Sequence, residues 1–342
     1  MRRWSSLMVL LAAALLGAGC GSKTVVTEGP VTVQGAGATV PGGAEAGAPD
    51  MPGGARAVRI AVVTHGQASS PFWAIVRNGV DAAGRQMNAV ISYRAPDVYS
   101  LERMQRLIDQ AVASRPDGLV VSLPEPGLAP AIKRAVRSGI PTVTINSGSD
   151  MYKSLGVLAH VGQPEGDAGF KAGQRLVSLG VHHALCINLA IDNQGLDERC
   201  RGLTRAMRAA GGRATVVRID DQDPDAPRAI AAAVRKEDAD GVLAMNSTSG
   251  IAAAKALPRS SKVTVATFDL GPDVLKAVKA RRIAFAVDQQ AYLQGYLPVV
   301  LLAERARYGL FPAQGDVIPT GPNFVTPANA AKAIALSARS IR

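Results

Sequence analysis

The sequence is short of the residues on which catalytic and metal sites usually depend, with four histidines and three cysteines among 342 residues. It contains no Gly-x-Ser-x-Gly motif, no glycine-rich phosphate loop with a lysine, and no closely spaced His-Glu metal motif. Ser122 and Ser247 lack an evident histidine partner, and we expect His182 and His183 at the surface before a strand. The sequence therefore predicts no enzyme activity and no bound metal or cofactor.

Long hydrophobic runs are absent except near the start of the chain. There Arg2 and Arg3 precede the apolar run Leu7–Leu16, and small residues lead into Cys20. About ten apolar residues are too few to span a bilayer, which needs about 20, so the pattern predicts an export signal. The segment Leu16–Cys20 also resembles the lipobox of bacterial lipoproteins, which implies cleavage of residues 1–19 and acylation of Cys20. An ordinary cleaved signal is the alternative.

Residues 20–56 contain no aromatic side chain and no periodic pattern. Glycine, alanine, proline, threonine and valine dominate the stretch, which cannot bury enough apolar surface to offset its ordering entropy. We expect a disordered tether with a mean reach of about 30–35 Å. The chain from Cys20 onward carries 38 − 2 = 36 Lys and Arg against 27 Asp and Glu, a net charge of +9 without runs of five like charges. Such a surface favours anionic lipid headgroups, and outside the cytoplasm we expect no nucleic-acid partner.

The rest of the chain alternates apolar, β-rich runs with helical spacing. Strands are predicted at 58–64, 89–93, 118–122, 142–146, 185–188, 215–219, 241–245, 264–268 and 283–287, and helices at 72–87, 101–114, 128–138, 166–179, 196–210 and 226–237. Apolar strands between covering helices predict an α/β fold with doubly wound parallel sheets. One open sheet of about ten units is uncommon, so we expect two lobes that divide near 160–162. A ligand is then expected between the carboxyl ends of the strands.

Side chains suited to a hydroxylated ligand follow these strands. The set comprises His65, Phe72, Trp73, Asn146, Ser147, Asn188, Asn246, Asp269 and Gln289, with Arg199 early in a helix. Amides and charged groups pair with hydroxyls, which both donate and accept, and aromatic rings cover the apolar face of a sugar. We therefore expect a neutral polyhydroxy ligand.

These segments resemble the type I periplasmic binding proteins of the ribose and galactose branch, which serve ATP-driven sugar importers. The resemblance spans about 58–317. It rests on Ser70–Trp73, Gly139–Pro141 before Asn146 and Ser147, Glu198–Gly202, Val242–Asn246, Phe268 and Asp269 followed by Leu275–Val278, and Asp288–Gly295.

The resemblance implies two lobes joined by a three-segment hinge near 160–162, 288–290 and 317–320. The first lobe would hold residues 57–161 and 290–317, and the second 162–289 and 318–342. Phe72 and Trp73 would stack on the ligand, and Arg199, Asn246, Asp269 and Gln289 would bond its hydroxyls. Asn146 and Ser147 stand where many sugar binders have Asp-Arg, and His65 where a small or apolar residue is usual, which leaves sugar, polyol and cyclitol ligands open.

The resemblance also implies partners: the permease and ATPase subunits of an ABC importer, with the protein acting as a monomer. Together with the signal, it indicates a lipoprotein outside the cytoplasm, in the periplasm or at the cell surface. A receptor that signals to a sensor kinase or chemoreceptor is the alternative.

Each candidate residue has a purely structural alternative. Phe72 and Trp73 could be core residues, and His65 could be structural. Arg199 could pair with Glu198 or Asp197 at the surface. Asp269 and Asn246 could cap helices. Cys186 and Cys200 could form a disulfide in an oxidising compartment or stay as buried thiols.

Overall fold

The computed structural model describes residues 56–342, except 67–69, 190–192, 221, 313–314, 338, 340 and 342. The predicted signal, Cys20 and the tether up to residue 55 lie outside the described residues. Among the helices that are described, none is long and apolar enough to cross a membrane.

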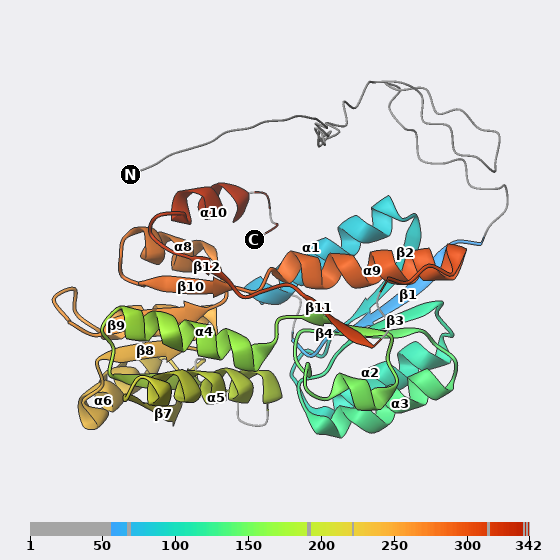
Figure 1. The fold of residues 1–342 in the computed structure, drawn as a ribbon. Coiled ribbons are helices and arrows are strands. Elements are labelled where there is room, and N and C mark those ends of the chain that lie inside the picture. The colour runs from blue at the N-terminus through green and yellow to red at the C-terminus, as the bar shows by residue number, and fades with distance from the viewer. Residues whose placement is uncertain are drawn as a thin grey trace, which may run out of the picture. The chain divides into compact units, whose positions relative to one another are not determined.

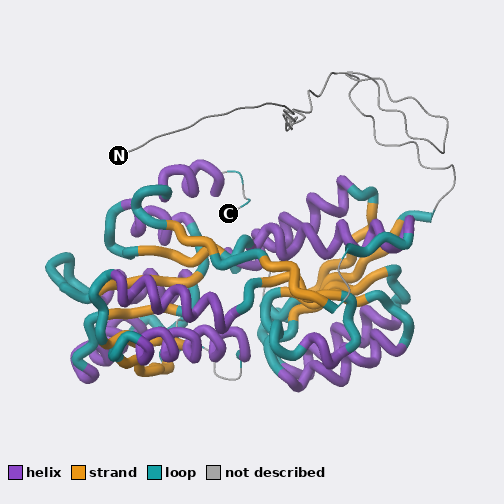
Figure 2. The backbone as a smooth tube through the Cα atoms, in the orientation of Figure 1, coloured by secondary structure: helices purple, strands orange, loops and turns teal. Residues whose placement is uncertain are grey.

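Two six-stranded sheets organise the chain (Figures 1 and 2). The first has the order β11-β5-β4-β3-β1-β2, with every pair parallel. Its strands are β1 (Val58–Val63), β2 (Ala89–Arg94), β3 (Gly118–Ser122), β4 (Thr142–Ile145), β5 (Ala159–Gly162) and β11 (Asp316–Pro319). The second repeats this arrangement as β12-β10-β9-β8-β6-β7, and β12 is antiparallel to β10. Its strands are β6 (His183–Asn188), β7 (Arg213–Arg218), β8 (Gly241–Ala244), β9 (Thr264–Phe268), β10 (Phe285–Asp288) and β12 (Asn323–Val325).

Helices cover both faces of each sheet, because alternate strand residues enter separate apolar clusters. On the first sheet, α1 (Pro71–Gln86) and α9 (Ala291–Tyr308) cover one face, and α2 (Leu101–Ala113) and α3 (Ala129–Arg137) the other. On the second, α4 (Glu165–Ser178) and α5 (Gln194–Ala209) lie opposite α6 (Ala226–Glu237), α7 (Ser247–Ala256), α8 (Pro272–Lys279) and α10 (Ala330–Ser337). Two 3-10 turns, η1 (Pro126–Leu128) and η2 (Tyr152–Leu155), complete the first lobe. The predicted fold of two doubly wound α/β lobes is confirmed.

The chain passes between the lobes after β5, after β10 and after β11, and the three passages touch one another. Gln290 Nε2 donates to Thr320 O at 2.6 Å, and a Cβ added to Gly321 would lie 2.9 Å from Gln163 Oε1 and 3.1 Å from Asp288 O. Two predicted boundaries need shifting. Gly162 pairs with Pro319, and Val161 pairs with Ile318, in the first sheet. Gly162, Ile318 and Pro319, which were assigned to the second lobe, therefore belong to the first.

The second lobe contains a disulfide between Cys186 of β6 and Cys200 of α5, whose Cα atoms are 5.8 Å apart. Both cysteines lie in the apolar layer between the sheet and the α4–α5 pair. The surface position expected for His183 is wrong, because His183 is the first residue of β6, is buried, and lies 2.9 Å through Nε2 from Thr215 Oγ1. His182 is exposed as expected.

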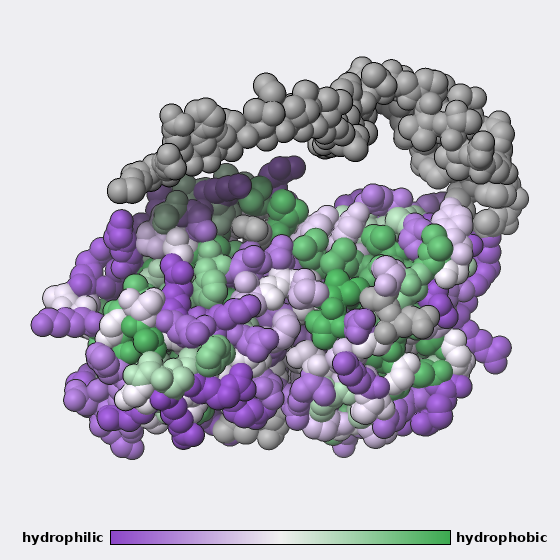
Figure 3. Space-filling view, in the orientation of Figure 1, coloured by the Kyte–Doolittle hydropathy of each residue, from purple (hydrophilic) through white to green (hydrophobic). Residues whose placement is uncertain are grey.

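On the face seen in Figure 3, the second lobe is mostly hydrophilic, whereas apolar residues gather over α9 of the first lobe. Leu297 and Val300 of α9 are only partly buried against the first-lobe core.

Candidate functional site

A cavity of about 160 Å³ lies where the carboxyl ends of the two sheets face each other. All nine residues predicted to bind ligand line it: His65, Phe72, Trp73, Asn146, Ser147, Arg199, Asn246, Asp269 and Gln289. Ser70, Leu189, Asn193, Leu196, Met245 and Thr248 also contribute, and sequence reasoning did not identify them as site residues. The volume is below the range of about 300–1,000 Å³ for drug-sized ligands. It suits one small ring and not a chain of several.

Two aromatic rings and an imidazole form the first-lobe wall. Helix α1 begins at Pro71, a residue preorganised for the first helical position, so Phe72 and Trp73 sit at the helix terminus beside the cavity. Their rings meet edge to face with centroids 5.1 Å apart, and the His65 and Trp73 rings do so at 4.7 Å. Trp73 is also part of the first-lobe core and 6% exposed. The core alternative therefore holds for Trp73 at the same time as its place on the cavity wall.

His65 is anchored by Ser122 at the end of β3. The His65 backbone N–H donates to Ser122 Oγ at 2.8 Å, and Nδ1 lies 2.9 Å from the same oxygen. Burial lowers the pKa of His65 to about 3, so the ring is neutral at physiological pH and both donates and accepts. The expectation that Ser122 lacks a histidine partner is wrong, because His65 is that partner. The sequence did not reveal the pair because the two residues are 57 positions apart.

Arg199 in the second-lobe wall has a partner that the sequence did not reveal. Its Nε and Nη2 donate to Glu165 Oε2 and Oε1 at 2.6 and 2.9 Å, and Nη1 donates to Met245 O at 3.0 Å. The guanidinium carbon lies 4.3 Å from the centroid of the Phe268 ring. Burial acts to lower the pKa of Arg199, but the charge of Glu165 and its hydrogen bonds raise it, so Arg199 stays charged.

The alternative partners of Arg199 are engaged elsewhere. Glu198 Oε1 accepts from Arg201, and Asp197 Oδ1 accepts from Asn188 Nδ2 at 2.8 Å. A surface pair with Glu198 or Asp197 is therefore wrong for Arg199, which is buried.

Close packing of α4 on α5 brings Glu165 and Arg199 together. A Cβ on Gly169 would lie 2.1 Å from Arg199 O, and one on Gly202 would lie 2.2 Å from Gly166 O. Only glycine allows backbones to approach so closely. Glu165 is the first residue of α4, where its carboxylate is favourable near the positive end of the helix dipole.

An amide ladder connects the two lobes across the cavity. Gln289 Nε2 donates to Asp269 Oδ1 at 2.5 Å, while its Oε1 accepts from Asn146 Nδ2 at 3.3 Å and from Gln294 Nε2 at 2.9 Å. Gln294 also donates to Thr320 Oγ1 at 3.2 Å, in the third passage between the lobes. The ladder therefore links the cavity to the hinge, and sequence reasoning missed Gln294.

Backbone conformation and electrostatics mark Asp269 as a strained group. Its φ is 65°, and Asn146 and Gln290 have φ values of 67° and 53°, in the left-handed region where strain gathers at functional sites. Burial raises the pKa of Asp269 to about 6, helped by the charges of Glu165 and Asp288 and opposed by Arg199 and Gln289.

Of the two strand-end residues that could cap helices, Asn246 does so and Asp269 does not. Gly271, not Asp269, is the residue that precedes α8 as its N-cap. Asn246 does cap α7, accepting from Ser249 N at 2.8 Å, and it lines the cavity as well.

The lobes also touch at the mouth of the cavity. Gln194 N donates to Pro124 O at 2.9 Å, and a Cβ on Gly195 would lie 2.8 Å from Ser147 Oγ. Ser147 Oγ itself donates to Asn146 Oδ1 at 3.1 Å. A molecule in the cavity would therefore contact both lobes at once.

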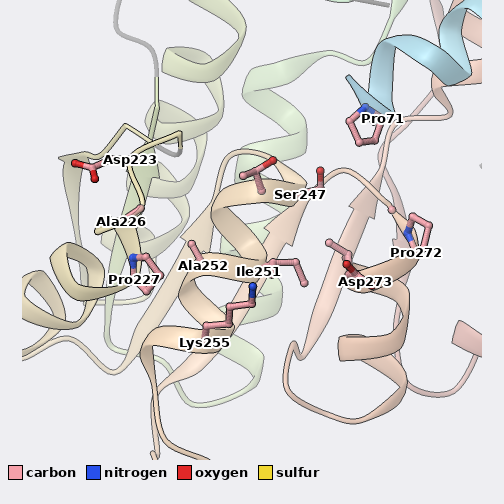
Figure 4. A pocket seen from close by; sticks show the side chains of 13 residues that line it. Pro71, Asp223, Ala226, Pro227, Ser247, Ile251, Ala252, Lys255, Pro272 and Asp273 are labelled. Carbon is pink, nitrogen blue, oxygen red and sulfur yellow. The ribbon is translucent and has the colours of Figure 1, made fainter. Parts of the chain in front are cut away.

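A larger cavity of about 350 Å³ lies next to the first, against α6, α7 and α8 (Figure 4). Pro71 reaches it from α1, while Ile251, Pro272 and most other lining residues belong to the second lobe. None of the nine predicted residues lines it, and it has neither aromatic rings nor amides. Its chemistry suits a hydroxylated ring less well than the smaller cavity does. Across the described residues, no group of three or more His, Cys, Asp or Glu could hold a metal ion.

Comparison with known proteins agrees with this geometry. The profile described as periplasmic binding protein domain matches residues 60–309. A carbohydrate transporter from Acidothermus cellulolyticus, solved in complex with myo-inositol, is 32% identical with a TM-score of 0.78, and the match covers 84% of this chain and 100% of that one. A glucose-galactose binding protein from Geobacillus stearothermophilus is 23% identical, with a TM-score of 0.70 over 80% of this chain and 99% of that one.

An ABC transporter solute-binding protein from Burkholderia graminis, in complex with D-arabinose, is 22% identical, with a TM-score of 0.71 over 80% of this chain and 96% of that one. No curated protein sequence matches the chain. Proteins of this family bind solutes for transport and are not enzymes, which confirms the expectation that this chain is not one. The chain belongs to the periplasmic binding protein family, among the type I sugar-binding proteins of ABC transporters.

Proposed function

We propose that the protein captures a small, uncharged, polyhydroxylated ring between its lobes and delivers it to an ABC permease. The observation that carries the proposal is a cavity of about 160 Å³ that is lined by aromatic rings from the first lobe and by hydrogen-bonding groups from the second lobe. Rings cover C–H faces, while amides, Arg199 and Asp269 pair with hydroxyls. Because the 32% identical neighbour was solved with myo-inositol, cyclitols and monosaccharides are the first ligands to test.

Binding favours the closed arrangement because a ligand that touches both lobes makes its full set of contacts only there. Charge-assisted hydrogen bonds of about 1.5–3 kcal/mol each, together with ring contacts, are enough for micromolar affinity near −8 kcal/mol. The closed surface is what we expect a permease to recognise.

A thermal-shift screen tests the ligand proposal. Residues 57–342 are mixed with cyclitols, pentoses and hexoses, and a true ligand at 100 times its dissociation constant adds about 2.7 kcal/mol of stability. Ile251→Ala, in the larger neighbouring cavity, is the matched control and keeps the shift. Asp269→Asn reduces it. A ligand whose shift depends on Ile251 and not on Asp269 would contradict the assignment of the smaller cavity.

Membrane attachment is a separate part of the proposal. We propose that residues 1–19 are removed, that Cys20 carries the lipid anchor, and that the following segment tethers the binding domain outside the cytoplasm. Cys20→Ser should move the protein from the membrane fraction to the soluble extracytoplasmic fraction. Mass spectrometry of the wild-type N-terminal peptide should show acyl chains on Cys20. A membrane fraction unchanged by Cys20→Ser would count against the anchor alone, and not against sugar binding.

A further inference from the structure

The ionisable groups in and next to the cavity wall have a net negative charge, although an arginine forms part of the wall. Among the described residues that line the cavity, Arg199 is the one cation and Asp269 the one carboxylate, since His65 is neutral. Glu165 lies directly behind Arg199, and the buried Asp288 precedes Gln289 in the chain. With all groups ionised, one guanidinium and three carboxylates lie in or next to the cavity wall, a sum of 1 − 3 = −2.

Glu165 occupies the part of Arg199 that would otherwise grip an anion. A free guanidinium binds a carboxylate or phosphate through two parallel N–H donors. Here Nε and Nη2 already form such a fork with Glu165, at 2.6 and 2.9 Å, and the two side chains are 4% and 1% exposed. Because little water surrounds the pair, its charges compensate each other at close range.

The charges of Glu165 and Asp288 act against that of Arg199 at the cavity wall. The positive charge of Arg199 lowers the pKa of the Asp269 carboxyl, whereas the charges of Glu165 and Asp288 raise it. A carboxylate or phosphate on a bound ring would therefore find the attraction of Arg199 offset by these two carboxylates and would also lie beside the carboxylate of Asp269.

We propose that Glu165 determines specificity: by neutralising Arg199 it makes the cavity reject sugar acids and sugar phosphates and accept their uncharged counterparts. The proposal rests on the proposed sugar-binding function and adds to it which chemical class is excluded and which residue excludes it. Glu165 acts through Arg199, and no contact between Glu165 and the ligand is required.

Calorimetric titration of matched pairs tests the proposal. The pairs are myo-inositol with myo-inositol 1-phosphate and D-galactose with D-galacturonate, and the pair used is one whose neutral member binds the wild type. We expect the wild type to prefer the neutral member at least 100-fold, and Glu165→Gln to reduce this ratio at least 10-fold. Glu198→Gln is the matched control. Glu198 precedes Arg199 in α5, but its carboxylate pairs with Arg201, so the variant removes a nearby negative charge without freeing Arg199. Its ratio should equal that of the wild type.

Three outcomes would overturn the proposal. They are a wild type that binds the acid as tightly as the neutral sugar, a folded Glu165→Gln with an unchanged ratio, and a Glu198→Gln ratio that falls as far as that of Glu165→Gln. If Glu165→Gln does not fold, Glu165→Asp replaces it. That variant keeps the charge and should keep the preference for neutral sugars, so acceptance of acids by Glu165→Asp would equally refute the idea. Failure of every neutral compound to bind the wild type would instead refute the proposed function.

Discussion

Asp269→Asn should stabilise the protein and weaken ligand binding at the same time. In the unliganded protein burial of the Asp269 carboxylate raises its pKa from 3.8 to about 6, although the charge of Arg199 and the hydrogen bond from Gln289 act to lower it. Between these values the native state binds more protons than the unfolded state, so stability contributed by this group is present at low pH and is lost as pH rises through about 6. Above pH 7 the whole cost of ionising Asp269 is present.

The size of the effect follows from the shift. A change of about two pKa units at about 1.36 kcal/mol each gives up to about 3 kcal/mol, which the neutral amide of Asn would recover at pH 7.5. The Asn oxygen can still accept from Gln289, so the ladder stays intact. Binding moves the other way, because replacing a charged acceptor by a neutral one removes about 1.5–3 kcal/mol from a hydrogen bond to a ligand hydroxyl.

Calorimetric unfolding of ligand-free wild type and Asp269→Asn from pH 4.5 to 8 measures the first effect. The stability of the variant should exceed that of the wild type at pH 7.5, and the difference should shrink towards pH 4.5. Asp273→Asn is the matched control. Its exposed carboxylate, in the first turn of α8, pairs with Lys276, and its removal should not reproduce the gain in stability at pH 7.5. A variant less stable than wild type at pH 7.5, or a difference independent of pH, would refute the reasoning about Asp269.

Two further predictions concern the aromatic wall of the site and the disulfide of the second lobe. Phe72→Ala should weaken ligand binding with little loss of melting temperature. Trp73→Ala should lower stability by about 3–5 kcal/mol, because its indole is also a core side chain. Equal melting temperatures for the two variants would contradict these different roles of Phe72 and Trp73. Cys200→Ser should lower stability by about 3 kcal/mol, the value expected for opening a loop of this size, since the two cysteines are 14 residues apart. Thermal unfolding with and without reductant checks it, because the reductant should lower the melting temperature of the wild type and leave that of Cys200→Ser unchanged.

The sequence pattern predicted most of the fold because strand and helix periods are local properties. Strands such as 118–122 and 264–268, which are buried throughout or nearly so, and the helix at 226–237 were predicted with their observed bounds. The strands β5, β11 and β12 were not identified as strands. Their pairing depends on partners such as Asp316 with Ala159, which are far apart in sequence.

The site was predictable to the extent that function follows strand ends. Asn146, Asp269 and Gln289 each follow a strand directly, and the parallel topology brings them to the carboxyl ends of the two sheets, which face each other across the cavity. The interactions among them were not predictable. Glu165 gives no signal as the partner of Arg199 because the two are 34 residues apart and meet only through the packing of α4 on α5.

The internal partners of the site side chains determine how much of each remains for a ligand. Arg199 has five N–H donors, and three of them donate to Glu165 and Met245, which leaves two in fixed directions. Gln289 is held between Asp269 and Gln294, and His65 is held by Ser122. Side chains that are fixed before binding lose little conformational entropy when a ligand arrives. The amide ladder also contacts Thr320 in the hinge. A ligand that breaks or strengthens the hydrogen bonds of Gln289 therefore acts on the segment about which the lobes move. Selectivity and closure thus depend on the same hydrogen bonds.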